Sequence, residues 1–364
     1  MMYDTHPTIG GDPEFFIYID KKGKRKLVTA DKVLPGKGKK ADANRGQAFF
    51  DGVQAEINPN FNGCRETFAW NIQECLKYIY NVACKKFPKD KVIFAPLASV
   101  PITANDLKYA DSECSRFGCS PDSNIYTEEK MEYPDGKKFM TRFSGGHIHL
   151  GFSDIKYMKV MKDADKLYNL IKAFDYIPGI MSVALSQGKE EESRRNYYGK
   201  AGTYRIQKHG IEYRTLSSYW LTSPFLTSLV TSLVRDAFTI VYNNKEDELL
   251  FSQKDENEIR NIIDTGNANK AIDVYKKVII PAYDAIDIKK EVPMQLDYVR
   301  NLVDIMMKKG YTKLFNPYSM LNYWWIKAPW INDFPYSTTY GVRKFAKDVE
   351  HKFIKIDDVR KIGE

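Results

Sequence analysis

Residues 144–152 read SGGHIHLGF and place two of the five histidines of the chain, His147 and His149, two positions apart behind a pair of glycines. The alternation of side chains along a β-strand puts both imidazoles on one face and Ile148 and Leu150 on the other. Two imidazoles at this spacing can bind a metal ion, contact a phosphate or simply lie on a strand surface. The residues that accompany them elsewhere in the sequence indicate which of these three roles applies.

The segments around this stretch predict strands interspersed with helices. Residue composition and turn signals indicate strands over 9–20, 48–60, 92–100 and 143–152, and a pair over 204–221 that turns at His209–Gly210. Apolar residues at a helical period predict helices over 65–87 and 154–177. A strand over 48–60 would have a bulge at Gly52.

The order of these segments predicts an α+β fold. Beyond Pro224 the sequence reads as mainly helical. We therefore expect a catalytic domain over residues 1–222 and a mainly helical C-terminal region over 223–364, which could pack as part of the same domain.

Composition narrows the class of protein. The net charge of +8 favours an anionic partner such as a nucleotide, but no helix-turn-helix, zinc finger or similar motif supports nucleic-acid binding. Five cysteines without a C-x-x-C pair predict a reducing compartment. The N-terminus has no signal-peptide pattern and no run reaches the roughly 18 apolar residues of a membrane span, so we expect a cytoplasmic protein without membrane contact.

Acidic residues occupy segments that otherwise read as apolar strands. Asp12 and Glu14 alternate in GGDPEFF, so both carboxylates are expected on one face, where they repel each other unless a cation lies between them. Asp51 and Glu56 follow in FDGVQAEINPN. The alternative for Asp12 and Glu14 is one solvated acid and one buried pair. The alternative for Asp51 and Glu56 is that they are ordinary acids on an edge strand.

Basic residues accompany a further acid late in the pattern. Glu212 and Arg214 share one face of their strand, and Arg205 lies on the strand before it. The preceding stretch, SRRNYYGKAGTYR, brings Arg195 and Lys200 among glycines that allow an anion to approach the backbone, although it could be a solvated surface run.

This set of side chains indicates the chemistry. Oxygen donors outnumber imidazoles and no cysteine joins them, which suits Mg²⁺ or Mn²⁺ better than zinc. Two or more such ions with arginines around them suit phosphoryl transfer from ATP.

Six motifs in order resemble a known family. GGDPEFFI, DGVQAEINP, FGCSPDSN, GGHIHLGF, RRNYYGKAGTYR and IEYRTLSSYWL, between residues 10 and 221, resemble the phage-type COOH–NH2 ligases (type 2) of the glutamine synthetase and glutamate–cysteine ligase superfamily. The resemblance implies a glutamine synthetase-like curved antiparallel sheet that forms a funnel flanked by helices.

The resemblance also implies a role for each matching position. The ligands of a first metal ion are Asp12, His147 and Glu212. The ligands of a second are Glu14 and Glu56, with Asp51 as a candidate third acid. Contacts to phosphate or acyl phosphate fall on His149, Arg205 and Arg214, and further ATP contacts on Arg195 and Lys200. Apart from the resemblance, Glu56 and Asn58 are near enough in sequence to be considered for deprotonating the amine.

The expected function is an ATP-dependent ligase that joins a small-molecule or peptide carboxylate to an amine through an acyl phosphate and releases ADP and phosphate. A phosphotransferase acting on a guanidino or amine group, a metal-dependent hydrolase built on His-x-His, and a catalytically silent scaffold are the alternatives. The sequence leaves the substrates and the oligomeric state open.

Overall fold

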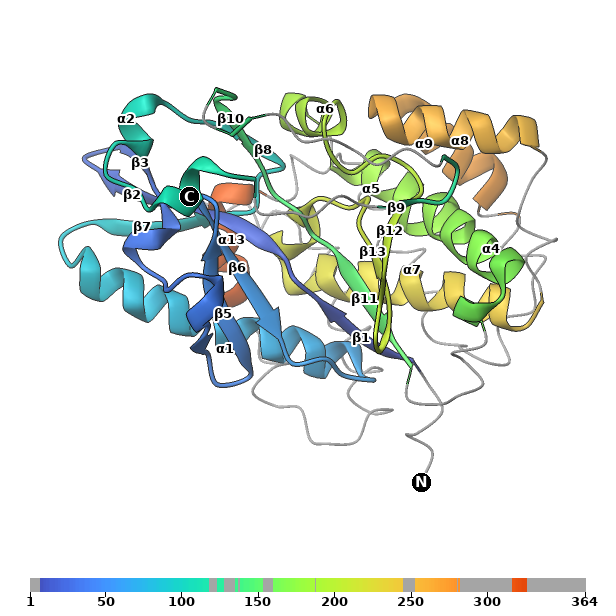
Figure 1. Cartoon of the computed structure of the whole chain (residues 1–364), viewed down its shortest axis with the longest axis horizontal. Helices are drawn as coiled ribbons and strands as arrows, with labels where there is room; N and C mark the ends of the chain where they lie inside the picture. The colour runs from blue at the N-terminus through green and yellow to red at the C-terminus, as the bar shows by residue number, and fades with distance from the viewer. Residues whose placement is uncertain are drawn as a thin grey trace, which may run out of the picture.

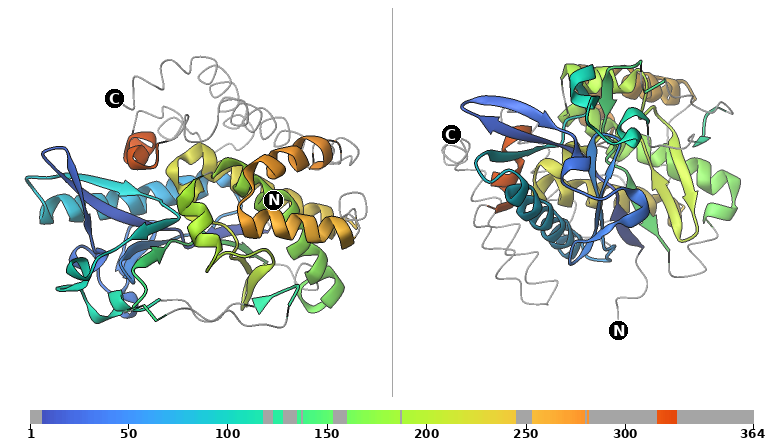
Figure 2. Two further views of the ribbon diagram at one scale, coloured as in Figure 1. Left: turned by 90° about the horizontal axis from the view of Figure 1, so that it is seen from above. Right: turned by 60° about the vertical axis from the view of Figure 1, so that its left-hand side comes forward.

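The structure is a computed structural model of the 364-residue chain. It describes residues 7–117, 123–127, 135–136, 138–152, 160–186, 188–244, 253–279, 281 and 316–325. Two antiparallel sheets form its centre, and helices pack around them (Figure 1). Residues 14–28 lie at one end of the molecule and residues 253–274 at the other (Figure 2).

The first sheet has five strands in the order β1-β11-β13-β12-β9. Their bounds are β1 Thr8–Gly11, β9 Ser123–Asn124, β11 Ile148–Gly151, β12 Thr203–Gln207 and β13 Gly210–Tyr213.

The second sheet has six strands: β3-β2-β6-β5-β4 in order, and β7, which pairs with β2. Their bounds are β2 Glu14–Lys21, β3 Lys24–Val28, β4 Ala41–Asp42, β5 Gly46–Asp51, β6 Gln54–Pro59 and β7 Lys91–Ala95. A separate pair joins β8, Ser99–Pro101, to β10, Thr141–Phe143.

The chain passes from one sheet to the other at Asp12–Pro13. We expected one strand over 9–20, but β1 ends before Asp12 and β2 begins at Glu14. Proline has no N–H to donate to a ladder, so it interrupts regular pairing. The segment is nevertheless bonded on both edges: the Glu14 N–H donates to the Gly145 carbonyl at 2.9 Å, and the Pro13 carbonyl accepts from the Ile57 N–H at 3.3 Å.

The expected single strand over 48–60 was wrong. The segment is a hairpin in which β5 and β6 pair from Gly46↔Pro59 to Asp51↔Gln54. Gly52 has φ 61°, a left-handed conformation that costs glycine little and other residues more, so the chain reverses there instead of bulging. The reversal leaves Asp51 beside the turn and Glu56 further along the returning strand.

Helices cover the sheets and fill the other end of the molecule. Their bounds are α1 Arg65–Lys86, α2 Ala104–Leu107, α4 Ala164–Phe174, α5 Ile180–Leu185, α6 Lys189–Arg195, α7 Pro224–Tyr242, α8 Gln253–Thr265, α9 Ala268–Val274 and α13 Met320–Trp325. Two π-helical turns are η4, Asp175–Gly179, and η7, Tyr275–Ile279. Short 3-10 turns occur at Ala30–Lys32, Lys37–Lys39, Ser112–Ser115, Ser218–Thr222 and Pro317–Ser319.

Helix α1 confirms the helix expected over 65–87. Its apolar side, which includes Phe68, Ile72 and Leu76, is fully buried, and the helix packs on β5, β6 and β7. Burial of such side chains stabilises the fold by roughly 1.5–3 kcal/mol each. The second expected helix, over 154–177, is present from α4 into η4, and residues 153–159 lie outside the described residues.

The expected pair over 204–221 is present only in its first half. Strands β12 and β13 form the hairpin, with the turn at Lys208–His209, one residue before the expected place. Beyond Arg214 the chain leaves the sheet and forms the 3-10 turn at Ser218–Thr222. Its largest side chain, Trp220, is fully buried and donates a 2.9 Å hydrogen bond to the Gly146 carbonyl, so packing replaces the second half of the expected strand.

The architecture is therefore a mixed α/β fold around curved antiparallel sheets (Figure 2). Among the helices of the described residues, none is long and apolar enough to cross a membrane. A funnel of the glutamine synthetase kind and a domain boundary near residue 222 stay predictions.

Candidate functional site

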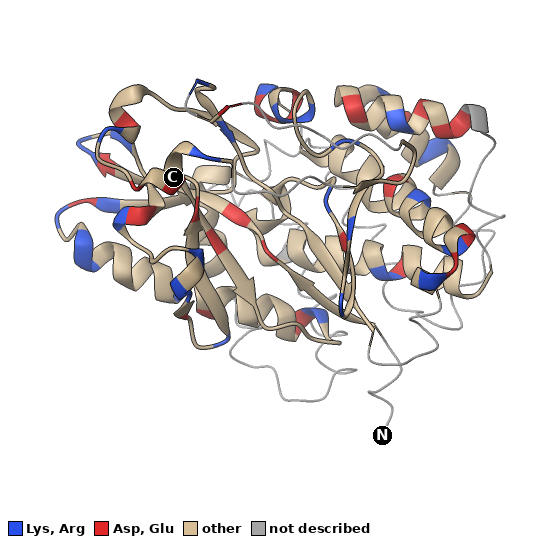
Figure 3. Ribbon diagram, in the orientation of Figure 1, with Lys and Arg blue, Asp and Glu red and all other residues tan. Residues whose placement is uncertain are grey.

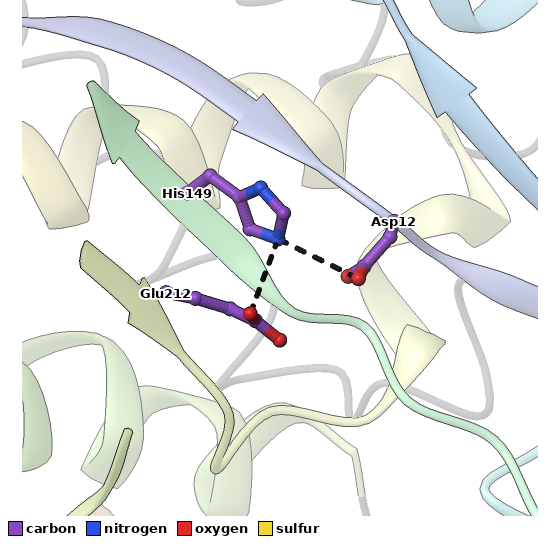
Figure 4. A group of neighbouring side chains, drawn as sticks. All are labelled: Asp12, His149 and Glu212. Carbon is purple, nitrogen blue, oxygen red and sulfur yellow. Dashed lines mark ion pairs between the residues drawn. The ribbon is translucent and has the colours of Figure 1, made fainter. Parts of the chain in front are cut away.

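A first group of potential metal ligands lies on the five-stranded sheet. Asp12, His149 and Glu212 each offer one ligand atom, and these atoms lie within 4.8 Å of one another (Figure 4). The strand register explains the convergence, because His149 on β11 is paired with Glu212 on β13. The His149 Nε2 atom is 3.5 Å from Asp12 Oδ2 and 4.0 Å from Glu212 Oε2.

Two atoms of this group are buried and lack well-aligned hydrogen bonds. Among the described residues, His149 Nε2 and Asp12 Oδ1 make no well-aligned hydrogen bond, although His147 Nδ1 lies 3.0 Å from Asp12 Oδ1 and Asp12 Oδ2 lies 3.5 Å from His149 Nε2. Burying such atoms unsatisfied costs free energy, whereas one imidazole nitrogen and two carboxylates together form a donor set that a divalent cation accepts. The residues present therefore fit a cation of the kind that the sequence predicts.

The carboxylates of this group favour the ionised form. Burial alone would raise the pKa of Asp12, but the neighbouring His147 and His149 outweigh it and hold that pKa well below its usual range. Burial and Asp12 likewise work against ionisation of Glu212, and His147, Arg214 and His149 together lower its pKa. Both acids are thus available as charged oxygen ligands.

A second group contains only acids and lies on the six-stranded sheet. Ligand atoms of Glu14, Asp51 and Glu56 also lie within 4.8 Å of one another. Glu14 on β2 is paired with Glu56 on β6, and Asp51 ends β5 on the neighbouring strand. Acidic positions lie within the central strands, and basic positions lie on the neighbouring β12–β13 hairpin as well as on helices and outer loops (Figure 3). Asp51, which the sequence offered as a candidate third acid, is brought to the other two.

Crowding of these acids favours protonation in the absence of a cation. Burial, together with the charges of Asp51 and Asp12, raises the pKa of Glu14 to about 8, although the Gly145 N–H donates a 2.6 Å hydrogen bond to it. Burial and the charges of Asp12 and Glu14 raise the pKa of Glu56 well above its usual range. A cation would release these protons, because it favours the charged form of each ligand.

The segment Asp12–Pro13–Glu14 connects the two groups. We expected both carboxylates on one face of one strand, yet each belongs to a different group because the chain changes sheets between them. The two groups are still close enough that the charge of Asp12 raises the pKa of both Glu14 and Glu56. Two neighbouring cation positions would follow from this arrangement.

His147 lies behind the first group with both ring nitrogens in contact. Its Nδ1 atom is 3.0 Å from Asp12 Oδ1 and 3.4 Å from Glu212 Oε1, and its Nε2 atom is hydrogen-bonded to the Tyr198 hydroxyl. Burial, and then the charge of Arg214, lowers the pKa of His147 despite the nearby carboxylates. The ring is therefore neutral at pH 7.

Two arginines, Arg205 and Arg214, border the first group, and their expected contact with phosphate stays a prediction. Arg214 donates to Glu212 and, at 3.0 Å, to the Tyr198 hydroxyl. Arg205 is paired with Glu212 across the hairpin, with its Nη1 atom 3.6 Å from the carboxylate, and its side chain is 32% exposed. Arg205 can thus meet a ligand from solvent, while the buried Arg214 is fixed by the protein.

Two expected ATP contacts point elsewhere. The buried Arg195 donates a 3.1 Å hydrogen bond to Ser182 Oγ and lies 3.5 Å from the Gly199 carbonyl, and Lys200 Nζ lies 3.5 Å from the Asp264 carbonyl. These contacts direct both side chains to neighbouring loops and helices. A nucleotide contact by either residue stays a prediction.

Arg194 and Tyr198 also help to form the site, and the sequence did not single them out. Arg194 is fully buried and donates to the carbonyls of Ser144, Thr215 and Leu216, so it clamps the start of SGGHIH against the end of β13. Tyr198 is buried, whereas its neighbour Tyr197 is 41% exposed. The stretch RRNYYGK signals a charged aromatic loop, but only the turn after α6 decides which arginine and which tyrosine face inward.

The two glycines before the histidines are required by close contacts. A Cβ atom at Gly145 would lie 2.5 Å from the His147 ring, and one at Gly146 would lie 2.2 Å from the Ser217 carbonyl oxygen. Both distances are shorter than van der Waals contact allows. The glycines let the strand pass beneath the imidazole and against the segment after β13.

The raised pKa values predict how stability of the metal-free protein depends on pH. Glu14, with a usual value of 4.5 and a folded value of about 8, binds more protons in the folded state between these values, so stability is highest near pH 5 and falls as pH rises to 8. Glu56 acts in the same direction. We expect a loss on the order of 3 kcal/mol.

Denaturant midpoints in EDTA, measured from pH 5 to pH 9, check this dependence. Asp175, whose burial raises its pKa to about 7, adds a similar trend that a metal ion does not remove. Addition of Mn²⁺ should reduce only the part of the pH dependence that comes from Glu14 and Glu56. A midpoint in EDTA that rises between pH 5 and pH 8 contradicts the expectation.

Comparison with known proteins agrees with the sequence motifs. The family model described as "Phage phiEco32-like COOH.NH2 ligase-type 2" matches residues 121–290, which confirms the stated resemblance over that range. The match includes the two histidines, Arg205, Glu212 and Arg214, and the motifs around Asp12 and Glu56 precede it. No curated protein matches the chain.

A similar solved structure is a crystal structure of a bifunctional glutathione synthetase from Pasteurella multocida, with 11% identity and a TM-score of 0.33. The match covers 96% of this chain and 52% of that one, so the chain spans about half the length of that protein. A TM-score this low does not indicate a common fold.

Proposed function

We propose that the protein is an ATP-dependent carboxylate–amine ligase that forms an amide through an acyl phosphate and releases ADP and phosphate. The matched family is one of COOH–NH2 ligases, which supports the reaction class. The observation that carries the proposal is the pair of acidic groups on either side of Pro13, one of them bordered by Arg205 and Arg214. We further propose that the curved sheets form a funnel that holds ATP and the carboxylate substrate.

The ion-binding residues divide into two sets in this proposal. Asp12 and Glu212 with an imidazole would hold one divalent cation, and Glu14, Asp51 and Glu56 would hold another. Mg²⁺ or Mn²⁺ suits both sets, and each ion would neutralise phosphate charge and orient the reacting oxygens. Ligand chemistry supports these assignments, because hard oxygen donors predominate in both groups.

The side chains of the protein have separate tasks in the first half of the reaction. The substrate carboxylate attacks the γ-phosphate, and negative charge spreads over the transferred group. Arg214, held in place by Glu212 and Tyr198, presents a planar cation to that charge, and Arg205 reaches it from the solvent side. Preorganised charge of this kind needs little rearrangement during the transfer.

The second half of the reaction needs a base for the amine. Glu56 is a candidate because its carboxylate borders Glu14 and Asp51, and an oxygen of it that the cation does not engage could accept the proton. The amine then displaces phosphate from the acyl phosphate and the amide forms.

The products of ATP test the proposal. With pooled amino acids, polyamines and peptides, we expect ADP, and phosphate whose release depends on the amine. A carboxylate substrate labelled with ¹⁸O should transfer one label to the phosphate. In the acyl phosphate one carboxylate oxygen is bonded to phosphorus, and it leaves with the phosphate when the amine attacks the carbonyl carbon. Liquid chromatography and mass spectrometry of the products measure both.

Other product patterns identify the alternatives. AMP and pyrophosphate with label in AMP indicate adenylation and contradict the proposed mechanism. ADP with a stable phosphoramidate and no amide indicates a phosphotransferase. Turnover without ATP, restored by zinc alone, indicates a hydrolase.

A further inference from the structure

A lysine-rich turn over residues 37–40 lies beside the second acidic group. Lys37 Nζ is 3.1 Å from Asp51 Oδ2, on one of the carboxylates that could hold the second cation. Lys40 Nζ lies 4.3 Å from the centre of the Phe49 ring, which belongs to the same strand as Asp51. Because Phe49 and Asp51 alternate on β5, both lysines lie over one face of that strand.

Both ends of the turn are fixed to strand β5. Before the turn, the Pro35 carbonyl accepts a 2.9 Å hydrogen bond from the Phe50 N–H, and Gly36 forms an isolated parallel bridge with Phe50. A Cβ atom at Gly36 would lie 3.3 Å from the Phe50 ring, so the glycine lets the turn pass close to the strand. After the turn, β4 pairs with β5 at Ala41↔Ala48. The lysines are therefore presented by a segment that is anchored on both sides.

Asn58 connects Lys40 to the second acidic group. With its amide oriented to satisfy its hydrogen bonds, Asn58 Oδ1 accepts from Lys40 Nζ at 2.9 Å and Asn58 Nδ2 donates to Glu56 Oε1 at 3.2 Å. A whole amide group thus separates the ammonium from the carboxylate that could bind the cation. An ammonium has three N–H donors, and Asn58 accepts one of them, so Lys40 can also bind an anion that lies beside the cation.

A cation in the second group would also change the surroundings of Lys37. The cation and the ammonium would share the Asp51 carboxylate, and like charges at such short range repel each other. An anion on the solvent side would relieve this repulsion, and the Lys37 side chain can reach it because it is 53% exposed. Both lysines therefore favour a negative charge next to the second cation.

We propose that Lys37 and Lys40 bind a second carboxylate of the substrate, so that the acid activated by the protein is a dicarboxylate. The reacting carboxylate would lie against the cation held by Glu14, Asp51 and Glu56, and the second carboxylate would lie against the lysine-rich turn. This inference rests on the proposed function for the reacting carboxylate, and it names the class of acid that the ligase accepts. An acid with a single carboxylate would lose the contacts to both lysines.

Binding of small acids tests the inference without turnover. Isothermal titration calorimetry with Mg²⁺ and a non-hydrolysable ATP analogue compares succinate, glutarate and adipate with butyrate, valerate and hexanoate, which match them in carbon number. We expect at least one dicarboxylate to bind about 10-fold or more tightly than its matched monocarboxylate, because hydrogen bonds to charged groups contribute that much to affinity.

Lysine variants locate the contact to the second carboxylate. Lys40→Gln keeps a polar side chain but removes the charge, so it should weaken dicarboxylate binding by about 10-fold or more and leave monocarboxylate binding unchanged. Lys37→Gln should act in the same direction. Lys40→Arg keeps the charge and should retain most of the affinity. Lys39→Gln, a change of the exposed lysine on the same turn, is the matched control and should alter the binding of neither class of acid.

The outcomes separate this inference from the function on which it rests. Equal binding of the two classes of acid, no binding of either class, or equal effects of Lys40→Gln and Lys39→Gln overturns the dicarboxylate site. ADP and amide formed equally well from dicarboxylates and monocarboxylates also overturn it, while the ligase proposal stands. A dicarboxylate that binds through Lys40 but yields no ADP with the pooled amines supports the binding site and overturns the proposed reaction.

Discussion

Glu14→Gln is expected to lower kcat by about 10²-fold or more while the protein folds normally. The glutamine keeps the size of the side chain and can still accept the hydrogen bond from the Gly145 N–H, but it brings no charge to the group with Asp51 and Glu56. Because the pKa of Glu14 is raised to about 8, the metal-free protein holds this side chain neutral at pH 7. The substitution should therefore change stability in EDTA little at pH 7 and raise it at pH 9.

Steady-state kinetics with saturating Mg²⁺ and denaturant midpoints in EDTA measure the two effects. Glu258→Gln, an exposed glutamate on α8, is the matched control and should change neither. A large fall in the midpoint at pH 7 with activity retained would show that Glu14 is structural and would remove the second cation from the mechanism.

Arg214→Lys is expected to lower kcat by about 10²- to 10³-fold with little change in the KM for ATP. Lysine keeps the positive charge but has all its donors on one nitrogen, so it cannot reproduce the fixed contacts that Arg214 makes to Glu212 through Nη1 and to Tyr198 through Nη2. The loss should appear mainly in the transition state, where charge on the transferred phosphoryl group is largest.

The exposed Arg116→Lys is the control for an arginine-to-lysine change outside the site. Fluorescence binding of a nucleotide analogue, together with kcat and KM, separates binding from chemistry. A rise in KM for ATP with kcat unchanged would place Arg214 in ground-state binding of the nucleotide instead.

Local sequence patterns predicted those parts of the fold that depend on periodicity. The spacing of Phe68, Ile72 and Leu76 predicted α1, and alternation predicted the strand that contains His149. Prediction failed where one turn changes the path of the chain. Gly52 reverses the segment 48–60 into a hairpin, and Pro13 divides the expected strand over 9–20 between two sheets.

Residue chemistry predicted which side chains come together at the site, but not how they divide between the two groups of potential metal ligands. Asp12, Glu212 and the histidines were expected together, and Asp51 was a candidate beside Glu14 and Glu56; the structure forms both groups. Among the described residues, Arg195 donates to Ser182 and Lys200 lies near the Asp264 carbonyl, on neighbouring loops and helices. Tyr198 and Arg194 were not selected, because nothing in RRNYYGK tells which side of the loop faces inward.

The sequence by itself determined the alternation of strands and helices, the supply of acids, imidazoles and arginines, and the resemblance to carboxylate–amine ligases, because each depends on residue type and spacing along the chain. Only the tertiary structure decided that Asp12 and Glu14 serve different groups, that both histidines face Asp12 and Glu212, and that Tyr198 contacts His147. Those features depend on the cross-strand register and on which edges of two sheets meet at Pro13. Contacts between residues more than a hundred positions apart are set by packing of the whole fold, which spacing along the chain does not specify.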